Sequence, residues 1–340
     1  MSSPNDAIPT DPILVVEAQD WERDTLFTRF PTGANIVARA ETLQEIDDSE
    51  TLQNARVLST FVHSRVDTEQ LDRLPAVKLI AVRASGLDHI DLDAARSRGI
   101  AIANVPDYGI HTVAEHTFAL LLAITRKIHR CYERTVRGDF SLKGLRGSDL
   151  HGKTLGVLGT GRIGRRVIEI ARGFGMRVIA HDIEPDDDLP GRLGFDYVDF
   201  DRLLTDSEIF TIHVPYNKRN HHLVDAEALT KLPLGAIVIN TSRGGVLDTH
   251  ALVSELKSGH LGGAGLDVLE GEEAIGEEAE IMYADYDEDT LKSVIRNHAL
   301  LSMPNVIITP HVAFNSHEAV QRIVQTTVDN VMNFLNGSGG

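Results

Sequence analysis

Three polar side chains each follow a short apolar, β-prone run in the second half of the chain. Arg243 follows one such run, His311 follows another, and Glu272 comes after a third, five residues beyond Asp267. In an open α/β sheet the carboxyl ends of the strands face the ligand crevice. We therefore expect Arg243, Glu272 and His311 to converge there.

An arginine, a histidine and a carboxylate in one crevice suit the reduction of a 2-keto acid. Arg243 can pair with a substrate carboxylate and polarise the ketone. His311 can protonate the nascent alkoxide, because an imidazole exchanges protons near neutral pH. Glu272 would favour the protonated ring and fix its orientation. Each residue alone also fits a structural role, and Glu270 and Glu273 compete with Glu272, so the prediction depends on the three together.

A glycine-rich loop in the middle of the chain would supply the hydride carrier. Its sequence is Gly159-Thr160-Gly161-Arg162-Ile163-Gly164. In a dinucleotide-binding loop the first glycine permits a tight turn, the second lets the backbone approach a pyrophosphate, and the third lets helix and strand pack closely. The N-terminus of the following helix supplies N–H groups and partial positive charge to the phosphates.

The segments around the loop make this interpretation stronger than the glycines alone. The β-prone run 154–158 precedes the loop, apolar residues at helical spacing follow from 165 to 174, and a second β-prone run, 177–181, ends at Asp182. A carboxylate at Asp182 can accept hydrogen bonds from the adenine ribose and would repel a 2′-phosphate. We therefore expect a dinucleotide-binding loop rather than an ordinary glycine turn, and NAD rather than NADP as the cofactor.

The composition excludes several other classes of protein. The 340 residues carry a formal net charge of −17, which argues against nucleic-acid binding, since that needs a basic patch. The one cysteine, Cys131, excludes internal disulfides and fits a reducing cytoplasm. The N-terminus is polar, and the apolar run 118–124 is too short to span a membrane. Acidic clusters at 184–187 and 270–289 fit a solvated face, and we expect no metal site there.

Alternating strand-like and helical segments predict an α/β fold with two parallel-sheet domains. In the first third of the chain the strand-like runs are 13–16, 34–37, 56–59 and 79–82, and beyond the glycine loop they are 209–212, 236–239, 263–266 and 306–308. The segment from Val113 to Arg130 is apolar around much of its circumference. Burial against a second subunit or between two domains would account for it. A final helix, from about Ser316 to Leu335, is placed to return to the first domain.

At this point the chain resembles the D-isomer-specific 2-hydroxyacid dehydrogenases, over residues 50–330. The motifs that carry the resemblance, besides the glycine loop, are Gly86-Leu87-Asp88-His89-Ile90-Asp91, Val113-Ala114-Glu115-His116, Asn240-Thr241-Ser242-Arg243-Gly244, Gly265-Leu266-Asp267-Val268 and Thr309-Pro310-His311. The resemblance implies that Arg243, Glu272 and His311 are catalytic. It implies two Rossmann-like or flavodoxin-like domains with a cleft between them, and a homodimer built around the helix that begins near Val113.

The resemblance also assigns the domains and the binding residues. Residues 1–108 and 316–340 would form a discontinuous substrate domain, and residues 109–315 the NAD-binding domain. The resemblance implies that Ser85 and Gly86 bind the substrate carboxylate. It implies that Asp182 and the loop His213-Val214-Pro215 contact the cofactor adenosine. The alternative for His213 is a packed loop histidine whose side chain has no role. Nicotinamide contacts fall to Thr241, Ser242 and Asp267, and Asp267 would hold the carboxamide.

Within the family, several positions are similar to the D-lactate dehydrogenase branch. Arg83 lies two residues before Ser85, and Tyr108 and Phe314 match aromatic residues that line a small substrate pocket in that branch. One departure is Gly109-Ile110-His111, where a serine-proline-type turn is expected after Tyr108.

Three functions are consistent with this sequence. The first is NADH-dependent reduction of a small 2-keto acid to the D-2-hydroxy acid. The second is oxidation of phosphite or another small oxyanion, which some relatives perform. The third belongs to a different class, a dinucleotide-sensing protein like the family's corepressors, and the absence of a basic region or a long disordered tail in the sequence weighs against it.

Overall fold

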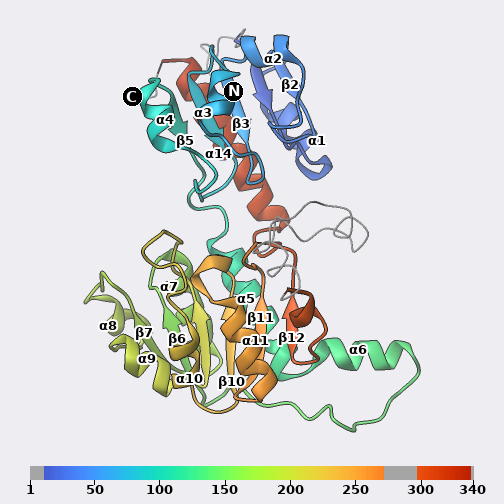
Figure 1. Cartoon of the computed structure of the whole chain (residues 1–340), viewed down its shortest axis with the longest axis vertical. Coiled ribbons are helices and arrows are strands. Elements are labelled where there is room, and N and C mark those ends of the chain that lie inside the picture. The colour runs from blue at the N-terminus through green and yellow to red at the C-terminus, as the bar shows by residue number, and fades with distance from the viewer. Residues whose placement is uncertain (1–10, 272–296, 338–340) are drawn as a thin grey trace. The chain divides into compact units, whose positions relative to one another are not determined.

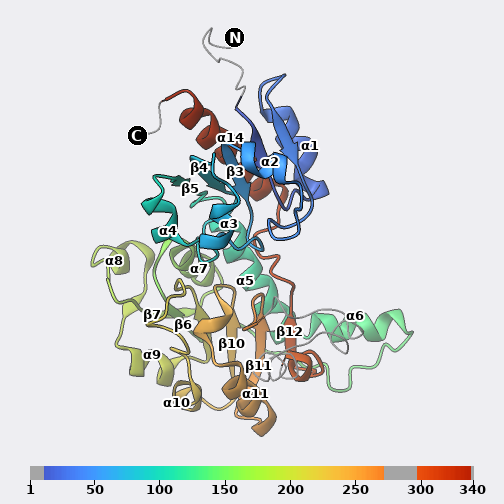
Figure 2. The same ribbon diagram turned by 45° about the horizontal axis from the view of Figure 1, so that its top comes forward.

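The computed structural model describes residues 11–271 and 297–337, and the chain falls into two compact units. The terminal unit comprises Met1–Tyr108 and Asn315–Gly340, and the central unit is Gly109–Phe314. Each unit contains a parallel sheet with helices packed on it (Figures 1 and 2). The predicted fold class, two parallel-sheet α/β domains, is confirmed.

The terminal unit is built on a parallel sheet with the strand order β2-β1-β3-β4-β5 in the described residues. This is the flavodoxin-like order. The strands are β1 (Ile13–Val15), β2 (Ile36–Ala38), β3 (Val57–Thr60), β4 (Leu79–Val82) and β5 (Ala101–Ala103), and the helices are α1 (Asp20–Arg29), α2 (Ser49–Asn54), α3 (Thr68–Asp72), α4 (Leu92–Ser97) and α14 (His317–Leu335).

The last helix of the chain packs into this N-terminal sheet. On α14 the buried residues Val324, Val328 and Val331 recur at helical spacing and join the core cluster that contains Ile13 and Val57. Figures 1 and 2 show the red α14 among the blue elements of the N-terminal segment. The terminal unit therefore needs both ends of the described chain to complete its core.

The central unit has a parallel sheet with the order β12-β11-β10-β9-β6-β7-β8 in the described part of the chain. The order reverses between β6 and β9, which is where Rossmann-type sheets open a ligand crevice. The strands are β6 (Thr154–Leu158), β7 (Arg177–His181), β8 (Asp196–Tyr197), β9 (Ile209–Ile212), β10 (Ala236–Asn240), β11 (Leu261–Leu266) and β12 (Val306–Ile308). The helices are α5 (Ile110–Thr125), α6 (Ile128–Val136), α7 (Arg162–Gly173), α8 (Leu189–Leu193), α9 (Phe200–Asp206), α10 (Ala226–Lys231) and α11 (Thr249–Ser258), with the 3₁₀ turn η1 (Gly244–Val246).

The apolar segment that begins near Val113 forms two helices rather than one. Helix α5 ends at Thr125, Lys127 adopts a left-handed φ of 52°, and α6 starts at the next residue. Helix α5 packs on β11, where glycines allow a close approach: a Cβ at Gly265 would lie 3.0 Å from the side chains of Leu120 and Ile124. The apolar surface of α5 thus packs largely on elements of its own unit.

None of the helices in residues 11–271 and 297–337 combines the length and apolarity that crossing a bilayer requires.

Candidate active site

The glycine loop lies between β6 and α7 and has the geometry expected of a dinucleotide-binding turn. Gly159 has a left-handed φ of 94°, and a Cβ there would lie 2.7 Å from the carbonyl oxygen of His213. A Cβ at Gly164 would collide with the carbonyl of Gly159, so only glycine lets α7 pack this closely. At Gly161, the residue before α7, no atom of the described chain beyond its own turn comes within 4 Å of a built Cβ. The backbone is therefore open to a phosphate at the N-terminus of α7.

Asp182 lies at the carboxyl end of β7, directly beside this loop. Its Oδ2 accepts hydrogen bonds from the backbone N of Thr160 at 2.6 Å and from the Thr160 hydroxyl at 2.8 Å, and its Oδ1 accepts one from the backbone N of Glu184 at 3.0 Å. Partial burial alone would raise the pKa of the Asp182 carboxyl, but these hydrogen bonds outweigh it and the pKa lies below its ordinary value. A fixed negative charge thus sits at the carboxyl end of β7, directly beside the glycine loop.

The segment His213-Val214-Pro215 follows β9 and packs against the glycine loop. Besides the His213 carbonyl, the Val214 side chain would lie 2.8 Å from a Cβ at Gly159. The Nε2 of His213 lies 2.9 Å from the hydroxyl of Thr211. Although the residue keeps some exposure, desolvation of the ring lowers its pKa to about 3, so the imidazole is neutral at pH 7.

The turn after β10 is held by a side chain to which the sequence analysis gave no role. The amide of Asn240 accepts hydrogen bonds from the backbone N and the hydroxyl of Ser242, at 3.0 and 2.9 Å, and donates one to the carbonyl of Arg243 at 3.0 Å. The buried hydroxyl of Thr241 pairs with that of Thr117 on α5 at 2.9 Å. These contacts fix the backbone that presents Arg243.

Arg243 itself is half-buried and donates from Nη1 to the carbonyl of Ser242 at 2.8 Å. The next residue, Gly244, packs on the chain after β11, because a Cβ there would collide with the backbone of Leu269 and Glu270. This contact brings the Arg243 turn beside the segment that leads toward Glu272. Glu272 lies outside the described residues.

Asp267, at the end of β11, clamps the turn that carries His311. The Asp267 carboxylate is 1% exposed: its Oδ1 accepts from the Thr309 hydroxyl at 2.5 Å and from the backbone N of Val312 at 3.0 Å, and its Oδ2 accepts from the backbone N of Ala313 at 2.8 Å. The backbone N of His311 donates to the carbonyl of Asp267 at 2.9 Å. Together these bonds hold His311 in a left-handed conformation, φ 51°, which a non-glycine residue rarely adopts.

A second histidine joins this clamp. The Nε2 of His116, on α5, lies 3.0 Å from the Thr309 hydroxyl and 3.4 Å from Oδ1 of Asp267. In the sequence, His116 belongs to the motif Val113-Ala114-Glu115-His116 and has no predicted role of its own, and its contact with Thr309 spans 193 residues. No periodicity or spacing in the sequence indicates such a distant contact.

The predicted substrate residues of the terminal unit lie in loops beyond its sheet. Ser85, in the loop after β4, is exposed, and its carbonyl accepts a hydrogen bond from the Asn104 amide at 2.8 Å. The adjacent Gly86 is half-buried. This loop begins at the fully buried Arg83, whose Nη2 pairs with Glu22 at 3.0 Å.

The two predicted aromatic pocket residues belong to different units. Tyr108 ends the first segment of the terminal unit, and its carbonyl accepts a hydrogen bond from Nε of Arg322 on α14 at 2.8 Å. Phe314 is the last residue of the central unit, and both residues are half-buried.

The chain is similar over most of its length to known dehydrogenases. Residues 118–313 match the model of the D-isomer specific 2-hydroxyacid dehydrogenase, NAD binding domain. The chain is 41% identical over 302 residues to 2-hydroxyacid dehydrogenase homolog 1 of Schizosaccharomyces pombe, covering 85% of this chain and 89% of that protein. It is 35% identical over 291 residues to the D-lactate dehydrogenase of Escherichia coli, covering 85% and 86%.

Solved structures give the same result. The D-lactate dehydrogenase of Aquifex aeolicus, in complex with NAD and lactic acid, superposes with a TM-score of 0.85 and 32% sequence identity, covering 96% of both chains. The strand order of the central unit and the geometry of its glycine loop agree with these similarities. The chain belongs to the D-isomer-specific 2-hydroxyacid dehydrogenases, a family of enzymes whose cofactor is NAD.

Proposed function

We propose that this enzyme catalyses the reversible NADH-dependent reduction of a small 2-keto acid to the D-2-hydroxy acid, in the manner of a D-lactate dehydrogenase. The observation that carries the proposal is the position of His311. The Asp267 clamp holds it at the edge of the sheet where β12 ends, and Arg243 follows the end of β10 at the same edge. Their positions at one edge of the sheet support a role for His311 as proton donor and for Arg243 as the group that binds the substrate carboxylate.

Bound NADH would supply a hydride to the carbonyl carbon of the substrate. Arg243 binds the substrate carboxylate and draws electron density toward the carbonyl oxygen. His311 donates its proton to that oxygen as negative charge develops on it, which yields the hydroxy acid. In the opposite direction the neutral imidazole of His311 removes the hydroxyl proton. Glu272 is proposed to orient the His311 ring and to stabilise its protonated form.

The residues of the central unit fit the rest of the dinucleotide. The open backbone at Gly161 and the N-terminus of α7, which begins at Arg162, suit the pyrophosphate. The Asp182 carboxylate suits the ribose hydroxyls of NAD and repels a 2′-phosphate. Thr241, Ser242 and Asp267 are proposed to lie beside the nicotinamide. Three protein donors already engage the Asp267 carboxylate, so a bond to the carboxamide would have to share it.

The terminal unit is proposed to be the substrate domain, with residues 1–108 and 316–340 assigned to it and residues 109–315 to the NAD-binding domain. Backbone groups at Ser85 and Gly86 would bind the substrate carboxylate, and Tyr108 and Phe314 would limit the size of the pocket. We place the enzyme in the cytoplasm, because its one cysteine suits a reducing compartment.

Replacing the proposed proton donor tests the mechanism. His311→Gln should lower kcat/KM for pyruvate reduction by about two orders of magnitude or more, the usual scale for losing a general acid, and should leave the Kd for NADH unchanged. The matched control is His250→Gln, which changes an exposed histidine on α11. If the His311 variant retained full activity, the mechanism would be wrong.

A substrate panel separates the remaining functions. Pyruvate, glyoxylate, hydroxypyruvate and branched or aromatic keto acids should be reduced with NADH, and phosphite should not be oxidised with NAD. Turnover of phosphite alone would support the oxyanion dehydrogenase. Tight NADH binding without turnover of any of these compounds would support the dinucleotide-sensing function.

The enzyme is further proposed to form a homodimer through α6. Ile128, Tyr132 and Val136 recur every four residues on this helix and are 56%, 71% and 68% exposed, and Phe140 and Leu142 beyond it are 78% and 86% exposed. Both views show α6 standing clear of the sheet of the central unit (Figures 1 and 2). An apolar stripe of this kind typically marks a protein–protein contact, and the continuous stripe on one helix suits a second copy of the chain.

The oligomeric state tests this proposal. Light scattering after size-exclusion chromatography should give the mass of a dimer for the native protein and of a monomer for Tyr132→Glu. A control substitution on an already polar position, Glu133→Gln, should leave the dimer intact. A monomeric native protein would refute the proposal, and so would a dimeric Tyr132→Glu variant.

A further inference from the structure

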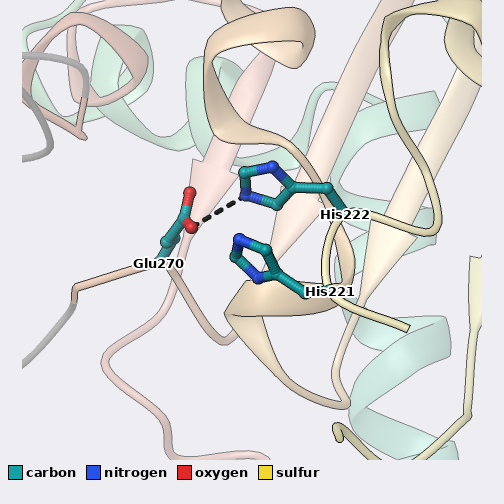
Figure 3. A group of neighbouring side chains, drawn as sticks. All are labelled: His221, His222 and Glu270. Atoms are coloured by element: carbon teal, nitrogen blue, oxygen red, sulfur yellow. Dashed lines mark hydrogen bonds and ion pairs between the residues drawn. The ribbon is translucent and has the colours of Figure 1, made fainter. Parts of the chain in front are cut away.

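We propose that His221, His222 and Glu270 form a binding site for a divalent transition-metal ion of the zinc class. One ligand atom from each of the three side chains lies within 4.8 Å of the other two. Figure 3 shows the two imidazole rings side by side, with the Glu270 carboxylate facing them. Glu270 begins the acidic cluster 270–289, for which the sequence predicts a solvated face and no metal site, whereas His221 and His222 lie outside that cluster.

Two separate segments of the central unit bring these residues together. His221 and His222 lie in the loop between β9 and α10, and Glu270 follows β11. The loop is anchored to η1, because the backbone N of His222 donates to the carbonyl of Gly245 at 2.9 Å and Val224 donates to Val246 at 3.0 Å. Glu270 is anchored by a hydrogen bond from the Asn297 amide to its carbonyl, at 3.2 Å. The backbone positions are therefore fixed before any ion binds.

The side chains already face one another. The Nε2 of His222 lies 2.8 Å from Oε1 of Glu270. The rings of His221 and His222 stack with centroids 3.8 Å apart and an interplanar angle of 25°, so their nitrogen lone pairs can point to the same side. His222 holds a left-handed φ of 52°, a conformation that costs a non-glycine residue energy and persists where the surrounding structure enforces it.

Two imidazoles and a carboxylate are a donor set that binds Zn²⁺ with a fourth position left for water. With ligand bonds of about 2.0–2.1 Å, the donor atoms of a tetrahedral site lie roughly 3.3 Å apart. The present spread of up to 4.8 Å therefore has to contract by rotation of side chains. His221 is exposed and the other two residues are half-buried, so this rotation does not disturb the core.

A tyrosine is placed to orient the outermost ligand. The hydroxyl of Tyr216 lies 3.4 Å from Nδ1 of His221, and the two rings meet edge to face with centroids 6.0 Å apart. The Tyr216 ring itself packs on Gly245, where a Cβ would lie 2.8 Å from it. A partner on one ring nitrogen fixes a ligating histidine and leaves the other nitrogen for the metal. This arrangement directs Nε2 of His221 toward the ion.

The alternative is that the bond between His222 and Glu270 only joins the two segments. His221 takes no part in that bond, so its removal distinguishes the alternatives. A bound ion would cross-link the loop before α10 to the chain after β11, and it would raise the melting temperature by an amount that depends on metal concentration.

The test is a Zn²⁺ titration of the full-length protein, freed of metal, in competition with a chromophoric zinc chelator and without substrate or NADH. We expect the native protein to bind Zn²⁺ at a site that His221→Ala weakens at least tenfold. The control His250→Ala, which removes an exposed histidine of α11, should bind as the native protein does. Zn²⁺ should raise the melting temperature of the native protein and of this control, but not of His221→Ala.

A second variant guards against effects on folding. Glu270→Gln keeps the shape of the side chain, so its far-ultraviolet circular dichroism should match the native protein while its Zn²⁺ affinity falls at least tenfold. With Co²⁺ as the probe, the native protein should show d–d absorption that both variants lack. Native affinity in either His221→Ala or Glu270→Gln would overturn the proposal, and so would an equal loss in His250→Ala.

Discussion

The Asp267 clamp provides the sharpest test of how the structure supports catalysis. Asp267→Asn keeps the size of the side chain but replaces one acceptor oxygen with an NH₂ donor. In the native protein Oδ1 serves Val312 N–H and the Thr309 hydroxyl, and Oδ2 serves the N–H of the buried Ala313. In one amide orientation the new donor opposes Ala313 N–H, and in the other it opposes Val312 N–H. Either way, one backbone donor loses its acceptor.

The cost follows from these contacts. Leaving a buried backbone N–H without an acceptor costs about 1–3 kcal/mol, and the remaining bonds lose about 1 kcal/mol when the acceptor is no longer charged. The clamp should therefore weaken by about 2–4 kcal/mol, which is roughly a 30- to 700-fold shift toward the open turn. Because His311 needs the clamp to keep its left-handed backbone, we also expect kcat/KM for keto-acid reduction to fall at least tenfold.

Hydrogen exchange measured by mass spectrometry on the peptide that contains residues 309–316 reads the clamp directly. The backbone amides of Val312 and Ala313 should exchange roughly 30- to 700-fold faster in Asp267→Asn than in the native protein. Thr309→Val is the matched control, because it keeps the shape of the side chain and both backbone bonds of the clamp. It removes only the hydroxyl, with its contacts to Asp267 and His116, and should cost less, about 1–2 kcal/mol. Native protection in Asp267→Asn, or a larger loss in Thr309→Val, would refute the reasoning.

Further predictions concern the cofactor site. Gly161→Ala should raise the Kd for NADH at least tenfold in fluorescence titrations, because its methyl group would fill the open backbone, whereas Gly173→Ala, a glycine of α7 with equally open surroundings, should leave that Kd unchanged. Asp182→Ala should narrow the preference for NADH over NADPH by roughly tenfold, and an unchanged preference would show that the ribose contact is misassigned. Between pH 6.5 and about 3, His213 is protonated mainly in the unfolded state, so the free energy of unfolding should fall as pH falls through this range. The urea midpoint of His213→Gln should therefore change less between pH 7 and pH 5 than that of the native protein. An equal change in the two proteins would contradict the burial argument.

Local sequence patterns were sufficient to predict the elements around the glycine loop. The predicted runs 154–158 and 177–181 match β6 and β7, and the glycines between them have the conformations that the motif requires. Buried parallel strands are nearly continuous apolar runs, so they are recognisable without knowledge of their neighbours. The short strands β5 and β8 were not predicted, because they lie at sheet edges and their residues are largely half-buried or exposed.

The sequence by itself determined the family, the dinucleotide loop and the residue types available for catalysis, because these depend on short runs and fixed spacings. Only the tertiary structure decided what surrounds them. Asp267 holds the His311 turn by hydrogen bonds, and His116 contacts the same turn although it lies 193 residues before Thr309 in the sequence. Helix α5 packs on the glycines of β11. The gathering of His221, His222 and Glu270 is of the same kind. Such contacts arise from which strands lie side by side in the sheet, and no local pattern in the chain encodes them.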